Sequence, residues 1–194
     1  LIQPGNLTPD IICFSYARGP ESGVVLPEEG VSLLRDALER GERVVGHNLS
    51  FDMGVVMKYD PSLTPLIFKH YEKGLCRDTM LREMLLLIRT GEFKFRKRGQ
   101  LSLAGLAQKY LKKELDKSEE GWRTHYSELK GLPIGQWPKE AIQYAEEDAI
   151  STLRVFEQQK RSPDEELQCR AAWALHLLSV LGIIPDQAAV EKHK

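Results

Sequence analysis

Closely spaced apolar segments near the start of the chain constrain its fold most strongly. Residues 10–17 (DIICFSYA) combine apolar and aromatic side chains as a buried strand does, and residues 23–26 (GVVL) follow after a short turn. Such close spacing predicts an antiparallel pair of strands. Residues 43–47 (RVVGH) read as another buried strand, and helical segments alternate with strands from there. This order predicts an α/β fold with a mixed β-sheet flanked by helices.

Apolar side chains that recur every three or four residues predict the helices. Capping residues support the assignments: Ser102 suits a helix N-terminus, as does Asp78 or Thr79, and Gly41 suits a helix C-terminus. We interpret residues 1–160 as one domain and residues 163–194 as the helical start of a following domain. The predicted helices cover residues 27–40, 48–59, 66–73, 78–89, 102–111, 138–160 and 163–182.

Composition limits the class of protein. Hydrophobic residues make up 42% and charged residues 28%, as in an ordinary globular protein, and the net charge of −1 requires any nucleic-acid contact to be local. The chain has no apolar run of membrane-spanning length and no secretory signal, so we expect an intracellular, cytoplasmic protein of bacterial or phage-like type. Three cysteines far apart (Cys13, Cys76 and Cys169) predict free thiols rather than a zinc site.

Two acidic motifs lie far apart in the sequence. HNLSFDMGVV (47–56) carries Asn48 and Asp52, and YAEED (144–148) carries Tyr144 and Asp148. Carboxylates that converge from different elements bind divalent ions such as Mg²⁺, and two such ions hydrolyse phosphodiester bonds. Tyr144 precedes Asp148 by four residues, so both side chains lie on one face of a helix and the tyrosine hydroxyl can orient a water.

Each of these residues also has a simpler interpretation when it is taken alone. An aspartate in a helix is usually a solvated surface residue, Tyr144 would be a core or boundary aromatic, and Asn48 would be a turn or capping residue. Spacing by itself does not decide between these interpretations and a metal site.

The strings that carry a family resemblance are VVGHNLSFDMGVV (44–56), RDTM (77–80), LSLAGLAQKYL (101–111), LDKSEEGW (115–122) and WPKEAIQYAEEDAISTL (137–153). In this order they resemble the DEDDy branch of the DnaQ-like 3′→5′ exonucleases. The resemblance implies a ribonuclease H-like fold, two divalent metal ions (Mg²⁺ or Mn²⁺), and the 3′ end of single-stranded DNA as substrate, with RNA less favoured.

The same resemblance implies roles for individual residues. Asp52 and Asp148 would bind the metals, Tyr144 would orient the attacking water, and Asn48 and Phe51 would contact the substrate. The family also has an Asp-x-Glu motif just before a strand like residues 10–17. Asp10 does not replace it, since Ile12 stands two residues later, and Glu21 lies beyond the strand. We therefore expect the motif upstream in the full protein.

A basic segment is a second candidate for substrate contact. Residues 91–100 (GEFKFRKRGQ) interleave phenylalanines with basic residues, including Lys94 and Arg96, which suits phosphates and stacked bases of a single strand. Lys117 is a further residue that we expect to approach the same nucleic-acid strand. The alternative interpretation of residues 91–100 is a solvated loop. Trp122 and Trp137 are interpreted as packing anchors, and Asp78 as a helix cap.

The C-terminal segment bears on the biological setting. One apolar stripe (Leu167, Ala171, Ala174, Leu175, Leu178, Leu181) and a second apolar face predict a helix buried between two partners. Together with GIIPDQAAVEKHK, it resembles the entry to the polymerase domain of family A DNA polymerases. We therefore favour a proofreading exonuclease with a covalently attached polymerase domain. Two alternatives remain: an RNA-trimming exonuclease resembling ribonuclease D, or a catalytically incomplete nucleic-acid-binding module if the Asp-x-Glu motif is absent.

Overall fold

The computed structural model describes residues 8–94, 99–115, 122–182 and 191–192. The strands are β1 (Phe14–Arg18), β2 (Glu21–Val25), β3 (Val44–Gly46) and β4 (Cys76–Asp78). The helices are α1 (Pro27–Glu39), α2 (Leu49–Tyr59), α3 (Thr64–Glu72), α4 (Thr79–Thr90), α5 (Leu103–Leu111), α6 (Lys139–Gln158) and α7 (Glu165–Leu181). Short 3₁₀ turns lie at Pro61–Leu63, Trp122–Thr124, Tyr126–Leu129 and Ile134–Gln136.

The strands form two small sheets. β1 and β2 are antiparallel, from Phe14 opposite Val25 to Arg18 opposite Glu21. β3 and β4 are parallel, with Gly46 opposite Asp78. In the described part of the chain these pairs do not join, so the prediction of one mixed sheet is corrected to an antiparallel pair and a parallel pair. The sequence predicted the antiparallel pair, although β1 begins later than expected, at Phe14.

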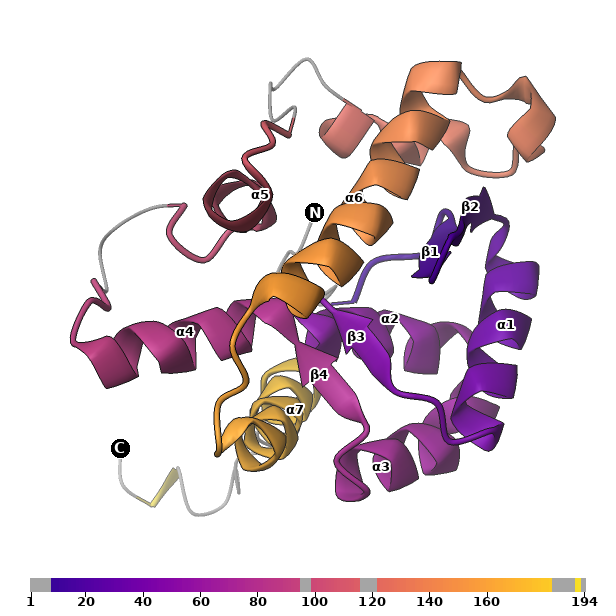
Figure 1. The fold of residues 1–194 in the computed structure, drawn as a ribbon. Coiled ribbons are helices and arrows are strands. Elements are labelled where there is room, and N and C mark those ends of the chain that lie inside the picture. Colours follow the sequence, from indigo (N-terminus) through magenta and orange to yellow (C-terminus); the bar gives the residue numbers. More distant parts are fainter. Residues whose placement is uncertain (1–7, 95–98, 116–121, 183–190, 193–194) are drawn as a thin grey trace.

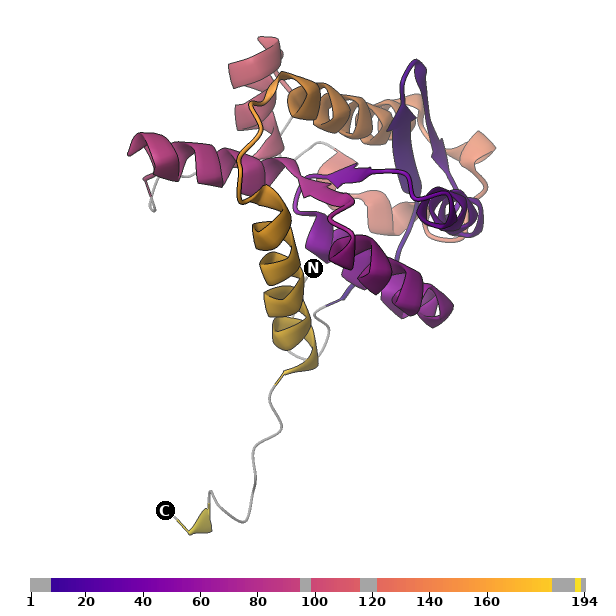
Figure 2. The same cartoon turned by 60° about the horizontal axis from the view of Figure 1, so that its bottom comes forward.

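Helices cover the strands from two sides (Figures 1 and 2). α6 contacts β1, β2 and β3 on one side and packs against α5. α7 contacts α2, α3 and β4 on the other side, as Figure 2 shows most plainly. The main core fills this second side, where the rings of Tyr71 and Trp173 stack with centroids 5.0 Å apart.

A smaller core anchors the start of α6. Trp137 is buried and its Nε1 donates to the Leu132 carbonyl at 3.0 Å, while Trp122 packs beside it. The Tyr126 hydroxyl donates to the carbonyl of Ala141, in the first turn of α6. The prediction that the two tryptophans are packing anchors is confirmed. These contacts fix the helix that carries the second acidic motif.

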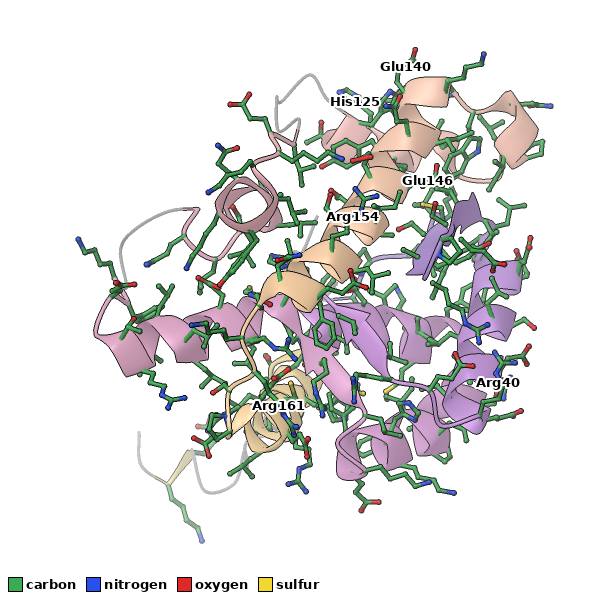
Figure 3. The ribbon with its side chains drawn as sticks, viewed as in Figure 1. Arg40, His125, Glu140, Glu146, Arg154 and Arg161 are labelled. Atoms are coloured by element: carbon green, nitrogen blue, oxygen red, sulfur yellow. The ribbon has the colours of Figure 1, made fainter. Side chains whose placement is uncertain are left out.

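α7 is joined to the remaining structure by ion pairs. Arg82 of α4 donates two hydrogen bonds to the Glu165 carboxylate, at 2.9 and 2.7 Å, and both side chains are buried. Glu166 accepts hydrogen bonds from Arg77 at 2.7 Å and from Arg161, labelled in Figure 3, at 2.8 Å. The first turn of α7 is therefore fixed by charge, and the next turns by packing of Cys169 and Trp173 into the main core.

The opposite face of α7 is open to solvent. Leu167, Leu175 and Leu178 of the predicted apolar stripe are exposed by 57%, 66% and 59%. Only one of the two apolar faces of α7 thus packs against the described residues. Among those residues, no helix combines the length and the apolar composition that crossing a bilayer requires.

Candidate active site

The first acidic motif begins where β3 ends. Glycine suits position 46, because a Cβ atom there would lie 2.7 Å from Leu49 Cδ1 and 3.0 Å from Leu49 Cβ. Asn48 then adopts a left-handed conformation (φ 66°, ψ 44°), which asparagine tolerates better than most residues. This turn reverses the chain from β3 into α2 and places Asp52 in the first turn of the helix.

A carboxylate from another element holds this turn. Asp78, at the end of β4, accepts hydrogen bonds from the backbone N–H groups of Asn48 (3.1 Å) and Leu49 (2.8 Å). It also accepts from Met80 (2.9 Å) and Leu81 (3.1 Å), which confirms the prediction that Asp78 caps α4. Burial raises the pKa of Asp78 above its ordinary value, while the four backbone donors act to lower it.

Asp52 combines solvent access with an electrostatic perturbation. Its side chain is exposed, yet loss of hydration, together with the nearby Asp78 carboxylate, raises its pKa to about 7. Asp52 therefore meets solvent and at the same time lies close to protein groups that weaken the hydration of its charged form. A cation bound there would relieve both causes of the raised pKa.

The second acidic motif lies on the middle of α6. Tyr144 and Asp148 are both partly buried there, one helical turn apart. The rings of Tyr126 and Tyr144 lie 6.2 Å apart, and the pKa of Tyr126 is raised mainly by burial, with contributions from Cys13, Asp148 and Tyr144. Tyr126 therefore lies beside both motif residues. Sequence reasoning missed Tyr126, which lies in a segment without a helical or strand pattern.

Neighbouring side chains fix how α6 lies on the strands. Glu146, labelled in Figure 3, accepts a 2.6 Å hydrogen bond from the Ser22 hydroxyl of β2. Lys113, just after α5, forms an ion pair with Glu147 of α6. These two glutamates, which lie within the motif between Tyr144 and Asp148, link α6 to β2 and to the segment after α5.

The donor chemistry of the two motifs suits divalent ions, although the set is small. Asp52 and Asp148 are carboxylates, which Mg²⁺ and Mn²⁺ prefer, and α2 and α6 both contact β3. In the described ranges, no group of three or more His, Cys, Asp or Glu side chains is arranged to hold a metal. Two carboxylates leave further positions of two octahedral ions to other ligands. That the two carboxylates converge stays a prediction.

The remaining predicted substrate residues fall in different places. Phe51 of α2 is partly buried and contacts the His176 ring of α7 edge-on, with centroids 6.3 Å apart. Lys94 is exposed, and its backbone N–H donates to Gln100 Oε1 at 3.2 Å. Arg96 and Lys117 lie outside the described residues.

A pocket of about 260 Å³ lies next to the first motif. His47, which directly precedes Asn48, lines it together with Phe93, Lys94 and Ser102. Nδ1 of His47 lies 2.9 Å from the Thr79 hydroxyl, which orients the imidazole. The pocket therefore combines an aromatic ring, a cation and an imidazole beside the turn into α2.

Comparison with known protein families decides the class. The family model described as 3′-5′ exonuclease matches residues 22–161. The chain belongs to this 3′-5′ exonuclease family. The match runs from β2 to the end of α6 and includes Asn48, Asp52, Tyr144 and Asp148. No curated protein and no solved structure matches the chain.

Membership in the exonuclease family establishes part of what the sequence predicted. The chain is a member of a family of phosphodiester hydrolases, and nucleic acid is the substrate that such a family implies. The family also implies the ribonuclease H-like fold and the use of divalent metals. The whole of α7 lies beyond the matched range, because the match ends at Arg161 and α7 begins at Glu165.

Proposed function

We propose that this exonuclease domain removes nucleotides from the 3′ end of single-stranded DNA by two-metal hydrolysis, as the proofreading part of a DNA polymerase. The observation that carries the proposal is the family match over both acidic motifs. In support, the helices that bear the motifs contact the same strand, β3.

In this proposal the two aspartates hold the metals. Asp52 and Asp148 would bind two Mg²⁺ or Mn²⁺ ions, which neutralise charge on the scissile phosphate and activate a water when they are bound. The phosphate itself and an Asp-x-Glu motif upstream would supply further oxygen ligands. Tyr144, one turn before Asp148, would accept or donate a hydrogen bond to the attacking water and so fix its direction.

The surroundings of the first motif suit the 3′ end of a single-stranded DNA. Asn48 would bind the 3′-terminal nucleotide from the turn into α2, and Phe51 would contact its base or sugar. The adjoining pocket offers Phe93 for stacking and Lys94 for a phosphate, so it suits the nucleotides that precede the end. Arg96 and Lys117 would extend this basic path.

The test uses the full-length protein and a single-stranded DNA labelled at its 5′ end. With Mg²⁺, wild type should give a ladder of products that shorten from the 3′ end. Asp148→Ala should give none, because it removes a ligand of a metal ion that stabilises negative charge in the transition state. Glu157→Ala is the matched control, since Glu157 is an exposed residue of the same helix. Equal ladders from wild type and Asp148→Ala would refute the assignment.

The same assay decides the substrate class. An RNA strand of equal sequence should be shortened more slowly than the DNA strand. Faster shortening of RNA would replace the proofreading proposal with an RNA-trimming exonuclease. Reading the coding sequence on both sides of this chain would test the rest, by showing whether an Asp-x-Glu motif precedes it and polymerase motifs follow it.

A further inference from the structure

Helix α2, which carries Asp52, has no cap of its own. Asn48, the residue just before the helix, makes no side-chain hydrogen bond to it, so the first N–H groups need a partner from elsewhere. A buried helix end without such a partner is strongly disfavoured. The only acceptors recorded for the N–H groups of Asn48 and Leu49 in the described residues are the two oxygens of Asp78.

Asp78 is placed for this role by the parallel pairing of β3 with β4. The register sets Gly46 opposite Asp78, so the chain leaves both strands at the same edge. The Thr79 hydroxyl donates to the Gly46 carbonyl at 3.3 Å and lies 2.9 Å from His47 Nδ1. Each residue from Gly46 to Leu49 is thus bonded to Asp78 or Thr79.

One carboxylate therefore joins two helix N-termini. Oδ1 accepts from Asn48, Met80 and Leu81, and Oδ2 accepts from Leu49. Asp78 is only 6% exposed, and it lines a small gap in the interior together with Leu49 of α2 and Cys169 and Ala172 of α7. The N-termini of both helices carry partial positive charge, and the Asp78 carboxylate balances it through these four hydrogen bonds.

We propose that Asp78 is a positioning residue for the exonuclease reaction: it holds Asn48 in the left-handed conformation and thereby sets where Asn48 and Asp52 meet the substrate and metal. This inference rests on the proposed function. Asp78 itself contacts neither the substrate nor the metal, because backbone N–H donors occupy its carboxylate oxygens. Asp52 lies one turn into the helix that Asp78 fixes, so a shift of that helix end moves its carboxylate directly.

Two substitutions at Asp78 separate this role from the capping of α4. Asp78→Asn keeps the shape but replaces one acceptor oxygen with an amide that cannot accept, so either Leu49 or the other three donors lose their partner. Asp78→Ser is a good N-cap and keeps α4 capped, while its short side chain has no second oxygen for α2. Asp60→Ala is the control, because it removes the aspartate that caps the 3₁₀ turn Pro61–Leu63, where Asp60 accepts from the Ser62 N–H at 3.0 Å, and leaves the first turn of α2 intact.

The experiment measures amide hydrogen exchange and single-strand DNA trimming in the full-length protein. In Asp78→Asn and Asp78→Ser, the amides of Asn48 and Leu49 should exchange faster than in wild type. The value of kcat should fall by roughly 10- to 100-fold, as expected for a misplacement of about 1 Å, with KM changed far less. Asp60→Ala should change neither the Leu49 exchange rate nor kcat.

Several outcomes would overturn the inference. Unchanged Leu49 exchange in Asp78→Ser would show that Asp78 does not hold α2. Faster Leu49 exchange with wild-type kcat would show that the turn need not be held for the reaction. A wild type that trims no strand would refute the proposed function and with it the positioning role, while the exchange data would still report whether Asp78 holds α2.

Discussion

Replacing Glu165 with glutamine should destabilise the chain by about 3 kcal/mol, because it leaves buried arginine charge without its counter-charge. Glu165 is fully buried and Arg82 is 5% exposed, and two hydrogen bonds of 2.9 and 2.7 Å join them. Nε of Arg77, which is also buried, lies 3.6 Å from the same carboxylate. One neutral substitution therefore affects two guanidinium groups.

The remaining contacts of Arg82 set the size of the effect. Breaking a buried pair typically costs about 3–5 kcal/mol. The lower end applies here, because glutamine still accepts one hydrogen bond, the Phe156 carbonyl accepts another at 3.1 Å, and the Phe156 ring lies 4.0 Å from the guanidinium. For a chain of this length, about 3 kcal/mol corresponds to a melting temperature lowered by roughly 6–12 °C.

Urea unfolding followed by circular dichroism measures this free energy, and two controls sharpen it. Glu166→Gln neutralises a carboxylate whose side chain is 41% exposed; because glutamine can still accept a hydrogen bond from Arg77 or Arg161, it should cost less than about 1 kcal/mol. The double variant Arg82→Met with Glu165→Leu should be more stable than Glu165→Gln, because it leaves neither charge buried. A Glu165→Gln protein within about 1 kcal/mol of wild type would refute the reasoning.

Three further predictions follow from other contacts. Tyr144→Phe should slow strand trimming less than Asp148→Ala in single-turnover assays, because it removes one orienting hydrogen bond and leaves the metal ligands; equal loss would contradict the water-orienting role. Lys94→Ala should reduce the slope of log affinity for single-stranded DNA against log salt concentration by about 0.7, because one DNA phosphate is no longer neutralised. Fluorescence anisotropy measures this slope, and an unchanged slope would favour the interpretation of residues 91–100 as a solvated loop. Burial lowers the pKa of His176, so the unfolded chain binds the proton more readily; wild type should therefore lose stability relative to His176→Asn as the pH falls below about 6.5, and parallel unfolding curves at pH 5 and 8 would contradict this.

The helices were the part of the fold that the sequence predicted best. Ser102 accepts from Gly105 as an N-cap should, and Gly41 follows α1 with a φ of +69° that glycine accommodates without strain. These signals are local, since a cap and the helix it begins or ends lie within a few residues. They depend little on the tertiary fold, which is why one sequence suffices to find them.

Strand β4 shows what the sequence did not predict. Its residues Cys76, Arg77 and Asp78 are all buried, but only the cysteine is apolar, so no hydrophobic pattern marks them. Arg77 is buried because Glu166 reaches it from α7, and Asp78 because it accepts four backbone hydrogen bonds. These partners lie outside the strand, and Glu166 lies far along the chain. The hydrogen bonds by which Asp78 joins α2 to α4 were missed for the same reason, because they too depend on tertiary contacts.

The site was predictable as a motif and not as a geometry. Asn48, Asp52, Tyr144 and Asp148 were identified from two short strings, and the family match includes all four. Their arrangement depends on how β3 pairs with β4 and on how α6 lies across β3, neither of which the strings encode. Tyr126, beside Tyr144, gave no signal because its place next to the motif comes from tertiary contacts with α6 and not from a local pattern.

The central claim is that the two acidic motifs form one metal site for 3′-end hydrolysis. Crystals of the full-length protein grown with Mn²⁺ and a short single-stranded DNA would test it by the anomalous scattering of manganese. The account predicts manganese bound by both Asp52 and Asp148, with the two carboxylates within about 8 Å of each other and the 3′ end of the strand beside them. Carboxylates on opposite sides of β3, with no manganese on either, would contradict it.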